Sequence, residues 1–229
     1  MSRNRGLTLI DVLAIALVAA LVALFVLPML RPPTGPLSRV SCMNNVRIIG
    51  MSMLMYAEDH DGRFMPLVDA AGNRVPAVDN EGGVSTLPAR SAFAVMLKEC
   101  YLTTTKTFQC PSSGERMPEG FPDDFKTAAL QDLVLADANC SYGWDPTKTH
   151  SAQATCAILA DKPRATPGTE GQANNNSQNH AGGEGQNVFY NDGHVRWHTN
   201  PKPDSGDDPD IYTGAAGYEK SATDAKIIR

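Results

Sequence analysis

Three histidines and two aspartates in the second half of the chain have side chains that could hold a transition metal. They are His180, His194, His198, Asp161 and Asp192, and imidazole and carboxylate groups are common zinc ligands. His194 and His198 are a poor pair, because four residues of extended strand place them about 13 Å apart. His180 can reach Asp192 or His194 if the intervening loop folds back. We prefer the alternative that the histidine and the aspartate fix a loop through hydrogen bonds to the backbone.

A second group of possible metal ligands lies near the end of the chain. Its acidic residues are Asp204, Asp207, Asp208 and Asp210. Carboxylate oxygens in a flexible segment suit Ca2+, which binds about six to eight oxygen ligands. The spacing does not distinguish a calcium site from a solvated acidic loop, which is the competing interpretation. The tail from Pro201 is expected to run along the surface.

The sequence contains no motif that argues for catalysis. Gly-x-Ser-x-Gly, a phosphate-binding glycine loop and His-Glu-x-x-His are all missing. The 229 residues carry 20 basic and 25 acidic side chains, a formal net charge of -5. This balance excludes a strongly cationic surface, so no nucleic-acid partner is expected. An apolar content of 42% excludes a disordered chain.

Local patterns predict the elements that must position these residues. Apolar residues at three-to-four spacing predict an amphipathic helix over 37–57 that closes at Gly62, and a shorter helix is expected around 91–99. Residues 154–160 predict a buried strand that ends at Asp161. Asp192-Gly193 between two apolar runs predicts a hairpin. The polar residues 167–186 predict a long surface loop.

The apolar content is concentrated in an early run. From Val12 to Leu30 there are nineteen residues without a charge, which at about 1.5 Å per residue matches the ~30 Å hydrocarbon core of a bilayer. Arg3 and Arg5 precede the run, so the positive-inside rule places that end in the cytoplasm and the rest outside. Asp11 sits at the membrane edge, where an ionisable group is costly and usually has a partner.

The residues Arg5-Gly6-Leu7-Thr8-Leu9-Ile10-Asp11 and the apolar run after them resemble the class III signal of type IV prepilins and type II secretion pseudopilins. The resemblance implies that prepilin peptidase cuts after Gly6 and methylates the new amino terminus at Leu7. It also implies that Asp11 neutralises the terminal amine of a neighbouring subunit during fibre assembly. The family usually has Phe at the position of Leu7 and Glu at that of Asp11.

Further stretches resemble one large pseudopilin-like family. They include Cys42 to Arg47, Tyr56 to Gly62, and Asn179-His180 through Asp192-Gly193. Members of that family end in a motif of His, nine residues, then Asp-Gly (H-x9-DG), whereas eleven residues separate His180 from Asp192 here. Major pseudopilins of type II secretion systems hold calcium in a C-terminal loop, which implies the same use for the acidic group near residue 208.

Five cysteines lie in the part of the chain expected outside the cytoplasm, where disulfides are permitted. They are Cys42, Cys100, Cys110, Cys140 and Cys156, and no two form a Cys-x-x-Cys pair. Cys140 and Cys156 could bridge if they lie on neighbouring antiparallel strands, and Cys100 with Cys110 would close a short loop. The connectivity stays open at this point.

We therefore predict an α+β, pilin-like fold, in which an N-terminal hydrophobic helix precedes a head with a small antiparallel sheet and long loops. The expected divisions are a leader peptide (1–6), a transmembrane and assembly helix (7–31), a proline-rich break (32–36) and an extracytoplasmic head (37–229).

The predicted function is that of a structural subunit of a type II secretion or type IV pilus-like fibre, not an enzyme. The resemblance implies a single-pass protein of the bacterial inner membrane, with a cytoplasmic N-terminus and a periplasmic or extracellular head. The implied partners are prepilin peptidase, other pilin-like subunits, an inner-membrane assembly platform and membrane lipid. The alternative is a signal-anchored, metal-dependent binding or hydrolytic domain that uses His180, Asp192 and His194.

Overall fold

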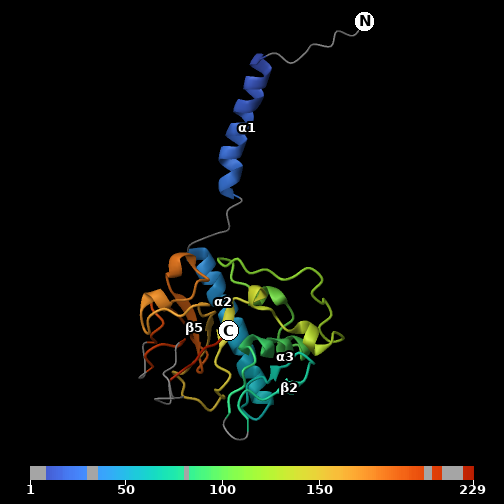
Figure 1. Ribbon diagram of the computed structural model, residues 1–229, viewed down its shortest axis with the longest axis vertical. Coiled ribbons are helices and arrows are strands. Elements are labelled where there is room, and N and C mark those ends of the chain that lie inside the picture. The colour runs from blue at the N-terminus through green and yellow to red at the C-terminus, as the bar shows by residue number, and fades with distance from the viewer. Residues whose placement is uncertain (1–8, 30–35, 80–82, 204–207, 213–223) are drawn as a thin grey trace. The chain divides into compact units, whose positions relative to one another are not determined.

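The computed structural model of the chain describes residues 9–29, 36–79, 83–203, 208–212 and 224–229 (Figure 1). The chain divides into two compact units, Met1–Pro33 and Thr34–Arg229. The first unit contains helix α1 (Leu9–Met29), and the second contains helix α2 (Pro36–Asp59) and the strands. The predicted leader and residues 32–35 of the predicted break lie outside the described residues.

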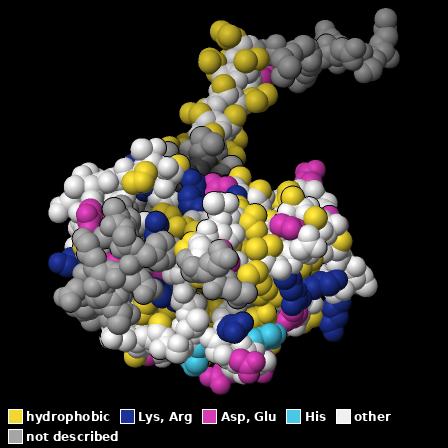
Figure 2. Space-filling model, turned by 60° about the horizontal axis from the view of Figure 1, so that its bottom comes forward, with side chains coloured by type: hydrophobic (Ala, Val, Ile, Leu, Met, Phe, Trp, Pro, Cys, Tyr) yellow, Lys and Arg dark blue, Asp and Glu magenta, His cyan; other side chains and the backbone are white. Residues whose placement is uncertain are grey.

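Helix α1 is apolar on every side, apart from Asp11 in its first turn. Every described side chain from Leu9 to Leu24 is exposed, and Figure 2 shows hydrophobic side chains along the face in view. In the part of the chain that the structure describes, no helix combines the length and the apolar character needed to cross a membrane. The transmembrane role expected for residues 7–31 stays a prediction.

Helix α2 confirms the amphipathic helix predicted over 37–57. Its buried face includes Cys42, Val46, Ile49, Met53 and Tyr56. These residues recur every three or four positions, which places them on one side of an α-helix, and that side packs against the sheet. Beyond the helix, Gly62 has a φ of +76° and its N–H donates to the Ala57 carbonyl oxygen at 2.8 Å. A residue in the left-handed region commonly ends a helix in this way.

A four-stranded antiparallel sheet lies at the centre of the second unit. Its strands, in order across the sheet, are β3 (Tyr142–Trp144), β4 (Ala157–Asp161), β5 (Gln186–Tyr190) and β6 (Val195–His198). In the β5–β6 hairpin Phe189 lies opposite Val195, and Gly193 in the turn has a φ of +88°. The predicted strand ending at Asp161 and the predicted hairpin are both confirmed.

Both faces of this sheet are covered. Phe189 belongs to the core that includes the buried face of α2, whereas Val188 packs with Ile211 and Ile227 from the C-terminal segment. Neighbouring side chains of a strand point to opposite faces, so the C-terminal segment covers the face that α2 leaves open. The tail from Pro201 was expected to run along the surface, and for its described residues 208–212 and 224–229, most of which are buried, this prediction is wrong. Strands β4 and β5 are buried along their whole length, so they need a cover on both sides.

Short elements complete the second unit. Strands β1 (Leu67–Val68) and β2 (Arg74–Val75) form a separate antiparallel pair. Helix α3 (Phe93–Lys98) confirms the short helix predicted around 91–99, and Figure 1 shows α2 between the region of α3 and the four-stranded sheet. The 3-10 helices are η1 (Ala89–Ala92), η2 (Thr105–Phe108), η3 (Leu130–Leu133), η4 (Asp137–Asn139), η5 (Ala173–Asn175) and η6 (Ala181–Gly183).

Candidate functional site

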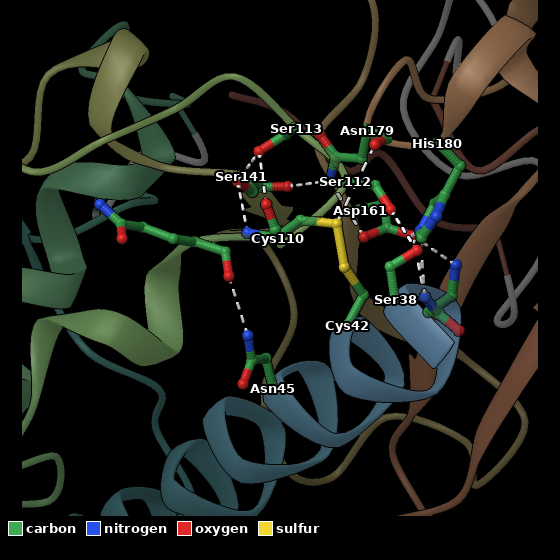
Figure 3. Close-up of a disulfide and its surroundings, with 12 residues drawn as sticks. Ser38, Cys42, Asn45, Cys110, Ser112, Ser113, Ser141, Asp161, Asn179 and His180 are labelled. Atoms are coloured by element: carbon green, nitrogen blue, oxygen red, sulfur yellow. Dashed lines mark hydrogen bonds and ion pairs between the residues drawn. A yellow bond between two sulfur atoms is a disulfide. The ribbon is translucent and has the colours of Figure 1, made fainter. Parts of the chain in front are cut away.

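A disulfide between Cys42 and Cys110 joins α2 to the segment that follows η2 (Figure 3). Both cysteines are fully buried. Cys42 belongs to the helix face that packs inward, and Cys110 lies against it, so the bridge fixes the start of α2 to the head. The remaining cysteines, Cys100, Cys140 and Cys156, are not part of a disulfide.

The two pairings considered from the sequence are wrong. In the β3–β4 pair Tyr142 lies opposite Asp161 and Trp144 opposite Leu159. Cys140 precedes β3 and Cys156 precedes β4, so in an antiparallel pair they lie toward opposite ends. Cys100 is exposed, whereas Cys110 is buried against α2.

Asp161, at the end of β4, is the centre of a buried polar cluster beside the disulfide (Figure 3). Its Oδ1 accepts a hydrogen bond from Asn179 Nδ2 at 3.0 Å, and its Oδ2 accepts one from the Asn187 backbone N–H at 2.7 Å. His180 Nε2 lies 3.3 Å from Oδ2. These contacts offset the desolvation cost that a fully buried carboxylate would otherwise impose.

The surface loop predicted over 167–186 is confirmed for residues 167–174, none of which is buried, but it is wrong for the residues next to His180. Asn176, Ser177 and His180 are among its buried residues. Asn176 Nδ2 donates to the carbonyl oxygens of Gly183 and Thr199, both at 2.8 Å. Side-chain amides carry donors and acceptors that can replace backbone partners, so a polar segment can be buried when its amides are paired.

The disulfide and the Asp161 cluster form one group of four donor residues. One ligand-type atom each from Cys42, Cys110, Asp161 and His180 lies within 4.8 Å of the others, and all four residues are buried. Asp161 and His180 are among the metal ligands predicted from the sequence, whereas no sequence pattern connects them with the two cysteines. No spacing rule links four residues that come from four separate segments.

The structure does not bring His180 together with Asp192 and His194. His180 and Asp161 lie near the start of β5, beside Asn187, whereas Asp192 and His194 lie in the turn after β5. Asp192 Oδ1 is 2.5 Å from His194 Nδ1, and both side chains are more than 40% exposed. This pair fixes the hairpin turn, in keeping with the loop-fixing interpretation.

The two described residues of the acidic group near the C-terminus are buried rather than solvated, and Asp204 lies outside the described residues. Asp208 and Asp210 are fully buried, and Asp207 lies outside the described residues. Asp208 accepts hydrogen bonds from the backbone N–H groups of Asp210 at 2.9 Å and Ala225 at 3.1 Å. Burial raises the pKa of Asp208 to about 7, with the charges of Asp224 and Asp210 adding to the effect. Asp224 was not predicted as part of this group, because it lies fourteen residues beyond Asp210 in the sequence, and calcium binding stays a prediction.

The residues expected to take part in processing are at the N-terminal end. Gly6 and Leu7 lie outside the described residues. Asp11 lies in the first turn of α1 and is exposed. The helix dipole stabilises a carboxylate at the N-terminal end of a helix, so Asp11 also favours formation of α1.

A cavity of about 750 Å³ lies at the end of α2, lined in part by Tyr56, His60, Arg74 and Lys148. The rings of Tyr56 and His60 stack at 3.8 Å, and Arg74 forms an ion pair with Glu99 at 2.5 Å. His60 Nε2 also lies 3.7 Å from Glu99 Oε2, so these contacts connect the end of α2 with Glu99 and Arg74.

Comparison of the chain with protein-family models, with curated proteins and with solved structures gives no match.

Proposed function

We propose that this chain is a pilin-like structural subunit that enters a type II secretion or type IV pilus-like fibre through helix α1. In this proposal prepilin peptidase cuts between Gly6 and Leu7 on the cytoplasmic side, and the head acts outside the inner membrane. The role is structural rather than enzymatic.

The exposure of α1 is the observation that carries the proposal. Its described side chains are almost all apolar, and Leu9 and Ile10 are each 77% exposed. A helix that is apolar all round is normally buried in protein or lipid, and large exposed apolar surfaces mark interaction sites. Equivalent helices of other subunits, and lipid before assembly, would cover this surface.

The charges around α1 support the same proposal. Arg3 and Arg5 precede the cleavage site expected after Gly6, and basic residues keep that end on the cytoplasmic side. Cleavage would create a cationic amine at Leu7, four residues from Asp11. Each charge is costly in an apolar environment unless it is paired, so pairing the amine with the acid of a neighbouring subunit would favour assembly.

The experiment is the intact mass of the full chain from cells with active prepilin peptidase. We expect a chain that begins at N-methylated Leu7. Gly6→Ala should leave Met1 in place, because the peptidase approaches a glycine backbone that has no Cβ. The matched control is Gly114→Ala, since a Cβ there would meet no other atom within 4 Å, and this variant should be processed normally.

Assembly can be tested separately at Asp11. Asp11→Ala should reduce cross-linking of the processed chain into multimers, whereas Asp11→Glu, which keeps the charge, should retain it. A wild-type chain that keeps Met1, or one that is trimmed beyond Leu30 and diffuses freely, would contradict the proposal.

A further inference from the structure

We propose that Cys42, Cys110, Asp161 and His180 form a redox-gated Zn2+ site, in which the dithiol form of the protein binds one Zn2+ and the disulfide form binds none. The inference goes beyond the proposed role in a fibre and does not depend on it.

The four donors converge from separate parts of the fold (Figure 3). Cys42 lies on α2, Cys110 follows η2, Asp161 ends β4 and His180 precedes η6. Their ligand atoms all lie within 4.8 Å of one another. Two sulfurs, one nitrogen and one oxygen in this arrangement suit tetrahedral zinc.

The distance between the two non-sulfur donors already fits a zinc site. Two ligands held at about 2.0–2.1 Å from a tetrahedral zinc lie about 3.3 Å apart. His180 Nε2 and Asp161 Oδ2 are 3.3 Å apart. Reduction frees the two sulfurs to separate to the roughly 3.8 Å that Zn–S bonds of about 2.3 Å require.

Outer contacts hold both non-sulfur donors in place. Asn179 and Asn187 donate to the two oxygens of Asp161. The ring of His180 makes a T-shaped contact with the ring of Trp197, with the centroids 4.9 Å apart and the planes at 84°. Hydrogen bonds and packing contacts from residues that surround the ligands orient those ligands in metal sites.

The burial of the four ligands indicates a structural rather than a catalytic zinc site. Cys42, Cys110 and Asp161 have no exposed surface, and His180 is 4% exposed. With four protein ligands the site is closed, so it would stabilise the head rather than catalyse a reaction.

The redox step balances with a dithiol as the reductant. Thiol–disulfide exchange breaks the Cys42–Cys110 bond, transfers two electrons to it and leaves two thiols, while the reductant becomes a disulfide. Zn2+ then binds both sulfurs as thiolates and releases their two protons to solvent. In the reverse direction a disulfide oxidant accepts the two electrons and two protons from solvent and becomes a dithiol, the Cys42–Cys110 bond forms again, and Zn2+ is released.

The test uses the full chain in detergent with Co2+ as a spectroscopic probe. One sample keeps the disulfide, and the other is reduced with a phosphine in denaturant and refolded without oxygen. We expect the reduced chain to bind one Co2+, with a sulfur-to-cobalt charge-transfer band and the intense visible bands of tetrahedral Co2+, and Zn2+ to displace it. The oxidised chain should show none of these bands.

Matched histidine variants separate this site from the other histidine cluster. His180→Ala should weaken Co2+ binding by more than the roughly 10–100-fold that loss of an outer contact costs. His194→Ala, at the exposed hairpin turn, should leave the affinity unchanged. Cys100→Ser should also leave it unchanged, because Cys100 is exposed and lies outside the group.

Three results would overturn the proposal. The first is a reduced chain with a native circular dichroism spectrum that binds no Co2+ or Zn2+. The second is equal loss of affinity in His180→Ala and His194→Ala. The third is a reduced chain whose melting temperature Zn2+ does not raise, because binding to a site that exists only in the folded state must favour folding.

Discussion

Loss of the Cys42–Cys110 disulfide should strongly destabilise the head. The bridge links residues separated by 68 positions, and for a loop of this length the chain-entropy relation gives about 4 kcal/mol at 25 °C. The second unit runs from Thr34 to Arg229. For a unit of this size each kcal/mol shifts the melting temperature by about 2–4 °C, so we expect a fall of about 8–16 °C.

The assay is thermal unfolding of the full chain by circular dichroism, with a metal chelator present. Cys42→Ala/Cys110→Ala is compared with wild type in the presence and absence of reductant. Reduced wild type should melt near the double variant, which also carries the smaller cost of the removed sulfurs. Cys100→Ser is the control and should melt like wild type. A double variant within about 2 °C of oxidised wild type would refute the reasoning.

Two further predictions concern packing and pH. Gly50→Ala should lower the free energy of unfolding of the head by about 1–3 kcal/mol in a denaturant titration, because the new Cβ would lie 2.4 Å from the ring of Phe189. This clash outweighs the ~1 kcal/mol gain in helix propensity. The control Gly114→Ala, where a Cβ would meet no atom within 4 Å, should leave the free energy of unfolding nearly unchanged. Burial raises the pKa of Asp208 to about 7, so the folded state favours the protonated acid. The resulting contribution to the free energy of unfolding is full below about pH 4 and is lost by about pH 7, a change of up to roughly 4 kcal/mol. Denaturant midpoints measured with a chelator present should fall as the pH rises across this range, and Asp208→Asn should make this fall smaller. A midpoint that falls equally steeply with pH in the variant would show that Asp208 does not cause it.

The elements predicted correctly from the sequence depend on signals within a short stretch. Helix α2 follows from apolar spacing, and the β5–β6 hairpin follows from Asp192-Gly193 between two apolar runs. The burial of Ile211 and Ile227 was not predicted, because it depends on which segment covers the second face of the sheet. The Cys42–Cys110 pairing likewise depends on how α2 packs, and no feature near either cysteine specifies it.

The polar composition of residues 167–186 predicts a surface loop, and Asp161 explains why residues 175–177, 179 and 180 of this segment are buried instead. The two carboxylate oxygens of Asp161 accept hydrogen bonds from Asn179 and Asn187, on either side of His180. A buried carboxylate is stable only when such donors surround it, so the end of β4 requires a polar segment to fold over it. Asn179 Nδ2 also donates to the Ser141 carbonyl oxygen at 2.5 Å, which ties the same segment to the start of β3. The composition of a segment indicates whether it favours contact with water. Whether a polar segment is buried depends instead on the hydrogen-bond acceptors that its donors contact in the folded chain.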